Sequence, residues 1–465
     1  MESALRVLSL PRKEYCSLSS FRKEGNGMIL FFDVNGREKY SLFCTWSAGE
    51  LTGPSYLYSI EAGSVVSVYT FYHDELVECE DVFIPASERC IVDGENGRRW
   101  EGPLFDEMLF NTVEEYNEDN VLVFRGSYFR NRRCGFGEEY YDFPLPYSVP
   151  VSRGFCMDDK WLGSIELFDR NGDYVRDQTV INNINVYPDV MVDSLPNVSI
   201  STITENITIS DGVELESECF DLSDWISLRS LHIGKFCFTR TSCFILHCLP
   251  LLRCVEIGES SFFHCFDRTG APNPYAFKTK VIKERRTAMI TSCSSLASFQ
   301  CGRNSFGDYV ALEMRDLPHL EQCQIGESDD EMSLNFYWCK TFCVQNLPSL
   351  VSLSFGSCSF YFCYDVDIRN CPRLQSIFFF SNAFANYSGK RVSLSLQSLP
   401  ALQSLRFGKE SFWNCQSVDM KSLPALRAVV IDSDALYRLK RFHYSHIDPS
   451  VISAVAVKRM YIPSQ

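Results

Sequence analysis

Residue types that could perform chemistry are abundant in this chain, but their spacing does not match catalytic or metal-binding sets. Among the 21 cysteines and seven histidines, Cys339 and Cys343 do not have the spacing of a structural zinc site. Gly135-Phe-Gly137 has neither the third glycine nor the following helix of a dinucleotide-binding loop. No Gly-x-Ser-x-Gly elbow presents a nucleophilic serine. The sequence therefore predicts no catalytic residue, no metal site, no cofactor and no small-molecule substrate.

Paired carboxylates are the remaining candidates for acid–base chemistry. They occur at Glu114-Glu115, Asp158-Asp159 and Asp329-Asp330. Acidic side chains are mostly exposed in folded proteins, so we interpret these pairs as solvated surface. The sequence thus favours a protein that is not an enzyme.

The strongest pattern is a phrase, Leu-Pro-x-Leu-x-x-Leu-x-Phe/Ile-Gly, that recurs eight times between Leu228 and Asp432. The second leucine of each copy is position zero, and the residues there are Leu228, Leu252, Leu296, Leu320, Leu350, Leu374, Leu402 and Leu426. Four of the seven steps between them are 24 residues long, and the others carry insertions. Self-similarity at this period indicates a stacked repeat protein, because a single unit cannot bury its apolar edge alone.

Each repeat is predicted to form two short strands joined by a corner. Apolar residues spaced by two precede and follow the Leu-Pro pair, and this is strand periodicity. The glycine at position six is expected to turn the chain with positive φ, and the phenylalanine at position ten to fill the turn. A solenoid of about eight to ten coils follows. Shortened phrases at 190–198, with Val190 and Val192, and at 442–457 are expected to form terminal caps.

The strand pattern of these repeats resembles that of leucine-rich repeat proteins. The following Gly-x-x-Ser-Phe resembles the corresponding phrase of their BspA-like subfamily, and the resemblance covers about residues 190–457. Glycine stands where the commonest leucine-rich pattern has asparagine, so the asparagine ladder of that family is not expected here.

Aromatic, glycine and acidic residues dominate the first 190 positions. The segment 124–141 contains Phe124-Arg-Gly126-Ser-Tyr128, Asn131 and Gly135-Phe-Gly137-Glu-Glu-Tyr140. It resembles a MORN repeat, and Trp100-Glu-Gly102 starts a partial copy 24 residues earlier. Alternating aromatic residues, with Asn-Gly or Gly-x-Gly marking the turns, predict an antiparallel hairpin meander, MORN-like or an unrelated antiparallel sheet. The predicted fold is therefore mainly β, with a hairpin domain at 1–185 and a leucine-rich repeat solenoid at 190–465.

Charge is divided unequally between these two regions. Residues 1–200 hold 18 Lys/Arg and 33 Asp/Glu, a net charge of −15, whereas residues 201–465 hold 26 of each. The acidic region repels nucleic acid and anionic membranes, so neither is expected as a direct partner.

The cysteines are interpreted as core residues rather than disulfides. Their number is odd, and Cys293, Cys301, Cys323 and Cys371 occupy apolar repeat positions, where a free thiol behaves as a small hydrophobe. Disulfides are rare in the cytosol, and no apolar stretch approaches the length that spans a bilayer. A cytoplasmic location is expected, with the cytoskeleton or a membrane as an alternative place of attachment.

Two surfaces are predicted to bind partners. The first is the row of residues four positions after each anchor: His232, Glu256, Gln300, Gln324, Ser354, Phe378, Arg406 and Val430. Aromatic residues and arginine favour protein interfaces, although an ordinary exposed row is the alternative. The second is a basic insertion at about 266–287, with Lys278, Lys280, Lys283, Arg285 and Arg286; a solvated loop is its alternative.

The resulting functional hypothesis is a scaffold or adaptor that binds protein partners of unknown identity through its repeat surfaces. The resemblance implies this role, since both repeat classes usually serve in protein interaction. Two alternatives remain open: a cell-surface or secreted BspA-like adhesin, and a regulatory subunit of a separate enzyme.

Overall fold

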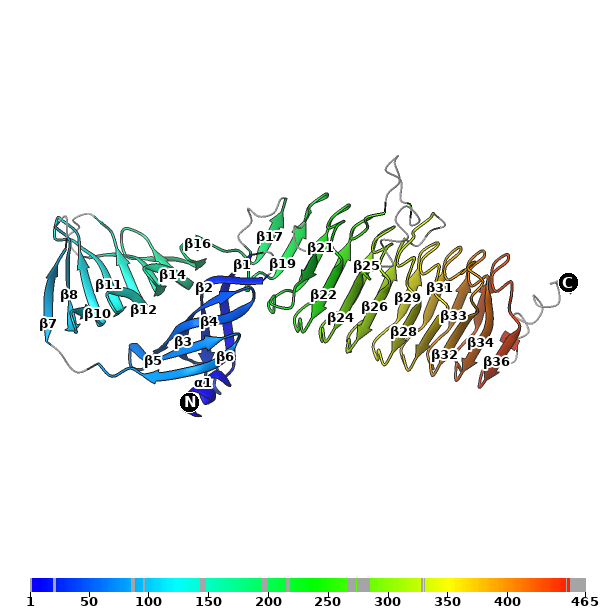
Figure 1. Cartoon of the computed structure of the whole chain (residues 1–465), viewed down its shortest axis with the longest axis horizontal. Helices are drawn as coiled ribbons and strands as arrows, with labels where there is room; N and C mark the ends of the chain where they lie inside the picture. The colour runs from blue at the N-terminus through cyan, green and yellow to red at the C-terminus, as the bar shows by residue number, and fades with distance from the viewer. Residues whose placement is uncertain are drawn as a thin grey trace. The chain divides into compact units, whose positions relative to one another are not determined.

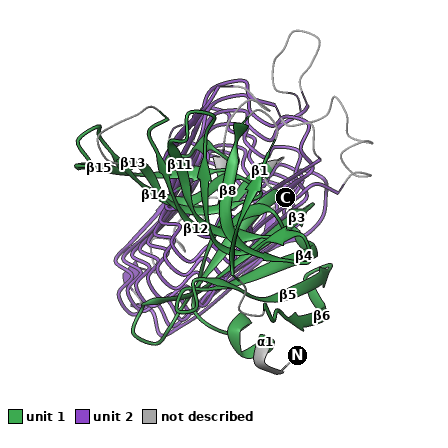
Figure 2. Ribbon diagram, turned by 90° about the vertical axis from the view of Figure 1, so that its left-hand side faces the viewer, with its two compact units in different colours: residues 1–188, 199–204 green, residues 189–198, 205–465 purple. Residues whose placement is uncertain are grey.

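The structure is a computed structural model, and it describes residues 2–19, 22–84, 88–94, 97–142, 148–193, 200–214, 218–265, 273, 285–327, 329, 331–448 and 450–451. The chain divides into two compact units, coloured separately in Figure 2. Unit 1 comprises Met1–Pro188 and Ser199–Thr204, and unit 2 comprises Asp189–Val198 and Glu205–Gln465. The described residues are almost entirely β structure, with one short helix, α1 (Glu2–Leu8), before the first strand.

Unit 1 consists of two antiparallel hairpin meanders, as the sequence predicts. The first sheet contains β1 (Arg12–Ser19), β2 (Arg22–Phe32), β3 (Glu38–Ser47), β4 (Glu50–Ser59), β5 (Ser64–Tyr72), β6 (Glu75–Asp81) and β18 (Ile200–Ser201). The second contains β7 (Arg89–Asp93), β8 (Arg99–Phe105), β9 (Met108–Leu109), β10 (Asn111–Tyr116), β11 (Leu122–Phe129), β12 (Arg132–Tyr140), β13 (Pro150–Met157), β14 (Lys160–Phe168), β15 (Tyr174–Ile181) and β16 (Ile184–Asn185). Their orders are β18-β1-β2-β3-β4-β5-β6 and β16-β15-β14-β13-β12-β11-β10-β8-β7, with β9 paired to β8.

The core of unit 1 lies between these two sheets. Phe43 and Tyr58 of the first sheet contact Phe155 of the second, with ring centroids 6.1 and 5.9 Å apart. A second cluster packs Ala4 of α1 against the other face of the first sheet. The second sheet carries a separate cluster around Val113 and Phe124. Each meander is therefore fixed by side chains that alternate between its faces.

Six hairpin turns in the described part of unit 1 contain two consecutive residues with positive φ. The pairs are Ala48-Gly49, His73-Asp74, Asp106-Glu107, Arg130-Asn131, Asp158-Asp159 and Asn182-Asn183. Such turns match the right-handed twist of the flanking strands. The Oδ1 atoms of Asn131, Asp159 and Asn183 accept hydrogen bonds from the backbone N–H groups of Leu109, Arg133 and Trp161, at 2.6, 3.0 and 2.6 Å. In these three turns, the second residue thus ties the hairpin to the preceding one.

The expectation that Gly135-Phe-Gly137 marks a turn is wrong. Both glycines lie inside β12, and the turn before this strand is Arg130-Asn131. A Cβ atom on Gly135 would overlap the ring of Tyr58, and one on Gly137 would overlap the ring of Phe124. These glycines are required because an aromatic ring lies against the strand on each face.

Unit 2 is a parallel β-solenoid of about nine turns, as the repeat predicts (Figure 1). One side is a ten-stranded sheet of β17 (Asp189–Val192), β19 (Asn206–Ile209), β21 (Ser230–Ile233), β23 (Cys254–Ile257), β25 (Ser298–Cys301), β27 (Gln322–Ile325), β29 (Ser352–Phe355), β31 (Ser376–Phe379), β33 (Ser404–Phe407) and β35 (Ala428–Ile431). The other side has a four-stranded sheet of β20 (Cys219–Asp221), β22 (Cys243–His247), β24 (Thr287–Thr291) and β26 (Ala311–Arg315). It continues as a five-stranded sheet of β28 (Thr341–Gln345), β30 (Asp365–Arg369), β32 (Val392–Gln397), β34 (Cys415–Lys421) and β36 (Arg441–Ser445).

The Leu-Pro phrase forms the predicted corner between the two strands of each coil. The backbone N–H of Leu350 donates to the carbonyl oxygen of Leu347 at 3.4 Å, and that of Leu402 to Leu399 at 3.1 Å. This spacing defines a four-residue turn with proline at its second position, where the fixed φ of proline is favourable.

The repeat glycine does not have the predicted role. Of the six glycines at position six, only Gly326 has positive φ. The phenylalanines at position ten take the left-handed conformation instead: Phe238, Phe262, Phe306, Phe360, Phe384 and Phe412. A Cβ atom on Gly258 would overlap the backbone of Gly234 in the preceding coil. Glycine is therefore needed for close approach between coils.

The position-ten phenylalanines form a continuous buried stack. The rings of Phe360 and Phe384 lie 5.1 Å apart with an interplanar angle of 1°, and Phe384 and Phe412 lie 5.0 Å apart at 8°. Where the sequence pattern places Asp330, which lies outside the described residues, Phe336 continues the stack between Phe306 and Phe360. This coil contains an insertion, so its stacked phenylalanine occurs later in the sequence than position ten.

The first coils differ from the predicted phase. The shortened phrase places Val190 and Val192 in the strand before a Leu-Pro corner. However, β17 pairs with β19, and Val190 and Val192 align with Ile207 and Ile209 in the ten-stranded sheet, whose strands follow the corner. The coil that contains β19 is not recognised from the phrase, because Ser210 occupies its glycine position. At the other end, Phe442 and Tyr444 align with Val418 and Met420, as expected of the final phrase.

Phe360→Ala is expected to lower the free energy of unfolding by about 3–5 kcal/mol, because it removes a fully buried ring from the stack. The matched control is Phe378→Ala on an outward, half-buried side chain, with an expected loss below about 1 kcal/mol. Urea unfolding of both variants measures the difference. Equal losses would show that the stack does not stabilise the coils preferentially.

Gly137→Ala is expected to destabilise the protein by about 1–3 kcal/mol, because its Cβ overlaps the Phe124 ring. In a Phe124→Leu background, which removes the overlapping ring atoms, the same substitution should have a clearly smaller effect. A double-mutant cycle from urea unfolding gives the coupling between the two positions. Additive losses would contradict the proposed fit between glycine and ring.

Candidate binding surfaces

The eight residues predicted to form a row on the ten-stranded sheet are direct neighbours in its register. His232 aligns with Glu256, Glu256 with Gln300, and Gln300 with Gln324. The alignment continues through Ser354, Phe378, Arg406 and Val430. All eight are exposed or half-buried, while the residues on either side of each in the first seven strands point into the core. This row, called here the outer row, is one continuous surface.

The first half of the outer row is polar and lines a hollow of about 330 Å³. His232 Nδ1 lies 2.9 Å from Glu256 Oε2, and Gln324 Nε2 donates to the carbonyl oxygen of Gly326 at 3.1 Å. Lys235 lies 3.8 Å from Glu259 at the border of the hollow. Cationic and anionic groups alternate here, so the hollow has no dominant charge.

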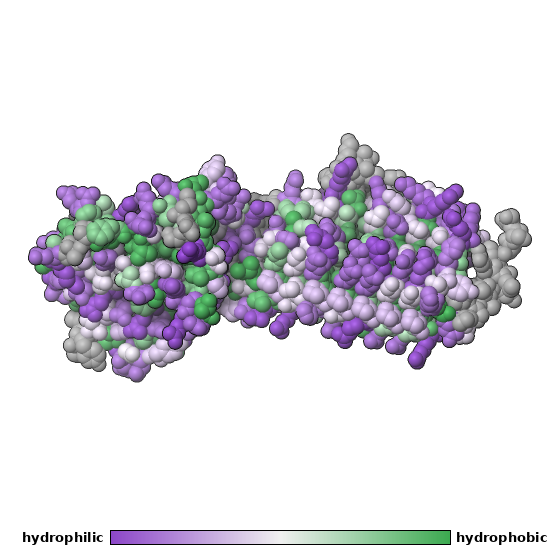
Figure 3. All heavy atoms as spheres, turned by 90° about the horizontal axis from the view of Figure 1, so that it is seen from below, coloured by the Kyte–Doolittle hydropathy of each residue, from purple (hydrophilic) through white to green (hydrophobic). Residues whose placement is uncertain are grey.

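The second half of the outer row is more apolar. Phe378, Arg406 and Val430 are consecutive neighbours across β31, β33 and β35. Arg406 Nη2 donates to Asp432 Oδ2 at 3.2 Å, and Val430 is 46% exposed. The row therefore changes from charged and amide groups to an aromatic ring, a guanidinium group and an aliphatic side chain. On the face drawn in Figure 3, most of the solenoid is polar, and hydrophobic residues appear only in small separate areas.

The basic insertion is only partly described. Lys278, Lys280 and Lys283 lie outside the described residues, and Arg285 is exposed. The assignment of Arg286 to an exposed docking loop is wrong, because this residue is buried. Arg286 Nη1 lies 3.1 Å from Asp308 Oδ2 and donates to the carbonyl oxygen of Thr239 at 3.1 Å. Arg286 thus fixes the end of the insertion to the body of the solenoid.

Burial disfavours the charge of Asp308 and raises its pKa to about 6, while Arg286 favours the charged form. The backbone N–H of His264 also donates to Asp308 Oδ2, at 3.2 Å. Taking both charges out of water is costly, so this pair is better explained by local ordering than by a net gain in stability.

A second aromatic column, next to the phenylalanine stack, was missed in the sequence. The ring centroids of Tyr361 and Tyr387 are 5.7 Å apart, those of Tyr387 and Trp413 are 4.5 Å apart, and those of Trp413 and Tyr437 are 5.3 Å apart. Tyr387 and Tyr437 are more than two-fifths exposed. In the sequence, this column could have been predicted from an aromatic residue directly after the position-ten phenylalanine. This pattern is not regular, because an insertion places Tyr387 three residues after Phe384 instead of one.

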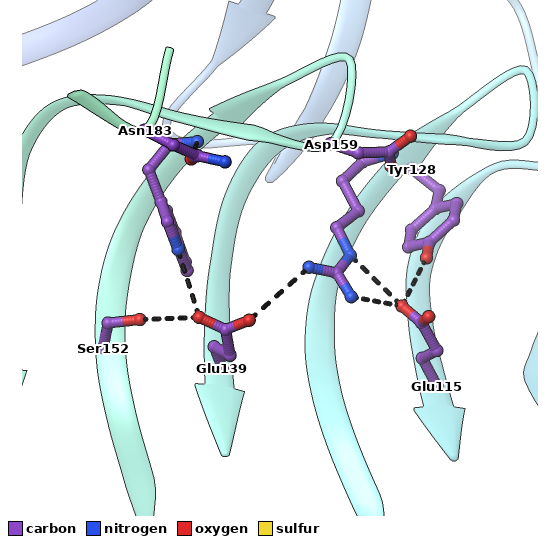
Figure 4. A network of polar contacts seen from close by, with 8 residues as sticks. Glu115, Tyr128, Glu139, Ser152, Asp159 and Asn183 are labelled. Carbon is purple, nitrogen blue, oxygen red and sulfur yellow. Dashed lines mark hydrogen bonds and ion pairs between the residues drawn. The ribbon is translucent and has the colours of Figure 1, made fainter. Parts of the chain in front are cut away.

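A polar network lies on the second sheet of unit 1 (Figure 4). Glu115 Oε2 accepts hydrogen bonds from Tyr128 Oη at 3.0 Å and from Arg133 Nε and Nη2 at 3.1 and 2.6 Å. Glu139 Oε2 accepts from Trp161 Nε1 at 3.2 Å and lies 3.3 Å from Ser152 Oγ. Burial and the neighbouring Glu115 charge raise the pKa of Tyr128, so this phenol remains a hydrogen-bond donor.

This network borders a hollow of about 610 Å³. Its lining residues are Val92, Arg98, Trp100, Leu104, Glu107, Leu109, Glu115, Tyr128, Asn131, Arg133 and Asp159. The Arg133 guanidinium stacks on the Phe124 ring, 4.0 Å from its centroid. The sequence did not indicate this site, because its residues come from several hairpins and follow no common period. It interpreted Glu115 and Asp159 as ordinary surface, whereas Glu115 is only 5% exposed.

The repeat cysteines lie in the core, as the sequence predicts. Cys293, Cys301, Cys323 and Cys371 are buried, and burial raises the pKa of each thiol, to about 12 for Cys301 and about 11 for Cys371. They therefore remain protonated and weakly nucleophilic. Within the described ranges, no group of three or more His, Cys, Asp and Glu side chains is placed to hold a metal ion.

No helix in the described parts of the chain is long and apolar enough to cross a membrane. No protein-family model matches the chain, and no curated protein is significantly similar to it.

Asp308→Asn is expected to lower the free energy of unfolding by about 3 kcal/mol, because it removes the carboxylate that pairs with the buried Arg286 guanidinium. Adding Arg286→Met removes that charge and should recover at least half of the loss. Urea unfolding of both variants tests this expectation. If the double variant is as unstable as the single one, the buried charge is not the cause.

Proposed function

We propose that this protein is a non-enzymatic scaffold that binds protein partners through the outer row of unit 2. The observation that carries the proposal is the register of eight outward side chains over successive coils. A partner that lies along the sheet contacts many coils at once, as is usual for solenoid proteins.

The change in chemistry along the outer row supports selective binding. Phe378 and Arg406 are residue types that often dominate binding energy, while the polar half, from His232 to Gln324, suits hydrogen bonds at a wetter border. A partner with an apolar and acidic end would align with one direction of the row only. The Arg406–Asp432 pair keeps the guanidinium extended at the surface.

Family and location are part of the same proposal. The repeat phrase favours a place among the leucine-rich repeat proteins, and segment 124–141 favours a relation to MORN repeats. Single cysteines at buried repeat positions suit a reducing compartment, so we place the protein in the cytoplasm.

A photo-crosslinking amino acid at position 378 is expected to capture a defined set of proteins in extracts of the source organism. The matched control is the same amino acid at Ser395, which faces outward from the opposite, five-stranded sheet. Capture at both positions alike would contradict a role for the outer row.

The double substitution Phe378→Ser/Arg406→Ser tests the same row without a crosslinker. It is expected to abolish capture of those partners, because it removes both anchors, yet to change Tm by less than about 3 °C, because both side chains point outward. Proximity labelling with the full-length chain reports the capture, and a thermal melt reports the folding. Unchanged capture in a folded variant defeats the proposal.

A further inference from the structure

The hollow of unit 1 has the dimensions and the lining of a ligand site. Its volume of about 610 Å³ lies in the range of pockets that hold a side chain or a small molecule. Trp100 and Tyr128 supply aromatic walls, and Val92, Leu104 and Leu109 supply aliphatic ones. The polar lining is about as extensive, with the side chains of Arg98, Glu107, Glu115, Asn131, Arg133 and Asp159.

The oxygen atoms of Glu115 indicate what the hollow can accept. All three hydrogen bonds that Glu115 receives end on Oε2 (Figure 4). No described residue donates a hydrogen bond to Oε1, although Glu115 is 95% buried and lines the hollow. Oε1 therefore keeps its acceptor capacity, and a ligand in the hollow that supplies an N–H group to it would form a charge-assisted hydrogen bond.

The charges around the hollow select the sign of the ligand. Three carboxylates, of Glu107, Glu115 and Asp159, face two guanidinium groups, of Arg98 and Arg133. Nε and Nη2 of Arg133 are already bonded to Glu115, and its face is stacked on Phe124, so Arg133 offers little to an anion. The net charge of −15 over residues 1–200 attracts cations from a distance.

We propose that this hollow binds a cationic side chain, of the arginine or lysine type, presented by a basic segment of a partner protein. The apolar stem packs between Trp100 and Leu104, and the charged end donates to Glu115 Oε1. The aromatic walls add a cation–π contribution. Asp159 and Glu107 belong to two hairpin turns that border the hollow, and they complete its acidic surroundings. This site is separate from the outer row, so the test of cation binding does not depend on whether the scaffold proposal is correct.

The test is a titration of the full-length chain labelled with 5-fluorotryptophan, followed by ¹⁹F NMR. The Trp100 signal is assigned with Trp100→Phe. Nα-acetyl-arginine amide is expected to shift this signal in a saturable way, with millimolar affinity because one side chain makes few contacts. Nα-acetyl-citrulline amide, which has nearly the same shape without the charge, should leave the signal in place. Nα-acetyl-lysine amide distinguishes guanidinium from ammonium recognition.

Glu107→Gln/Asp159→Asn removes two charges from the hollow while sparing its fold. Asparagine can replace Asp159 because Asn131 and Asn183 perform the same turn role with their Oδ1 atoms. Binding of the arginine amide should weaken about fivefold. The matched control, Asp74→Asn/Glu75→Gln, makes the same change at the equivalent turn of the first sheet and should leave binding unaltered.

Several outcomes overturn the proposal. Equal binding of the citrulline amide means that the hollow recognises shape alone. A saturable shift with Nα-acetyl-glutamate amide or inorganic phosphate, but not with the cations, means that it is an anion site. No saturable shift with either cation, in a chain whose wild-type melting curve shows it folded, means that it is not a cation site. An equal loss in the control variant assigns the effect to the overall charge of the protein.

Discussion

The stacking of one phenylalanine per coil is the constraint on which the solenoid depends. A left-handed conformation is unfavourable for a residue with a bulky side chain, by roughly 1–2 kcal/mol. Nevertheless, all six position-ten phenylalanines, from Phe238 to Phe412, adopt it and are buried. Each ring lies against those of the neighbouring coils, and burial of a whole ring outweighs the backbone strain. A coil cannot shift along its neighbours without breaking this stack, so the buried rings also fix the register of the outward side chains.

Aromatic rings also organise unit 1, but through glycine instead of through stacking. Phe124 lies across Gly137, and Tyr58 fits against Gly135 on the opposite face of the same strand. The Arg133 guanidinium stacks on the Phe124 ring, and Arg133 also donates hydrogen bonds to the Glu115 carboxylate. The chemistry of the hollow is therefore built on the absence of a side chain at one position of β12.

The sequence is most informative where a position must be filled in every coil, and least where one residue acts alone. The leucine and phenylalanine positions predicted the coils and the outer row, because each coil repeats the same packing problem. The glycines were misinterpreted, since a requirement for positive φ and a requirement for close approach select the same residue. Arg286 was placed in a solvated loop because its partner, Asp308, lies in another coil and no local pattern connects them. The hollow of unit 1 was not found for the same reason.

Positions that the packing leaves free are the ones that can carry binding chemistry. In the solenoid, the outer row varies from histidine to valine, while the residues beside it stay apolar or cysteine. In unit 1, the turn residues Asn131, Asp159 and Asn183 need only a side-chain oxygen to tie adjacent hairpins. Asparagine meets that need without a charge, so the carboxylate at position 159 is not required by the turn. The negative charge of Asp159 borders the hollow and can attract a cationic ligand. The fold needs only the side-chain oxygen.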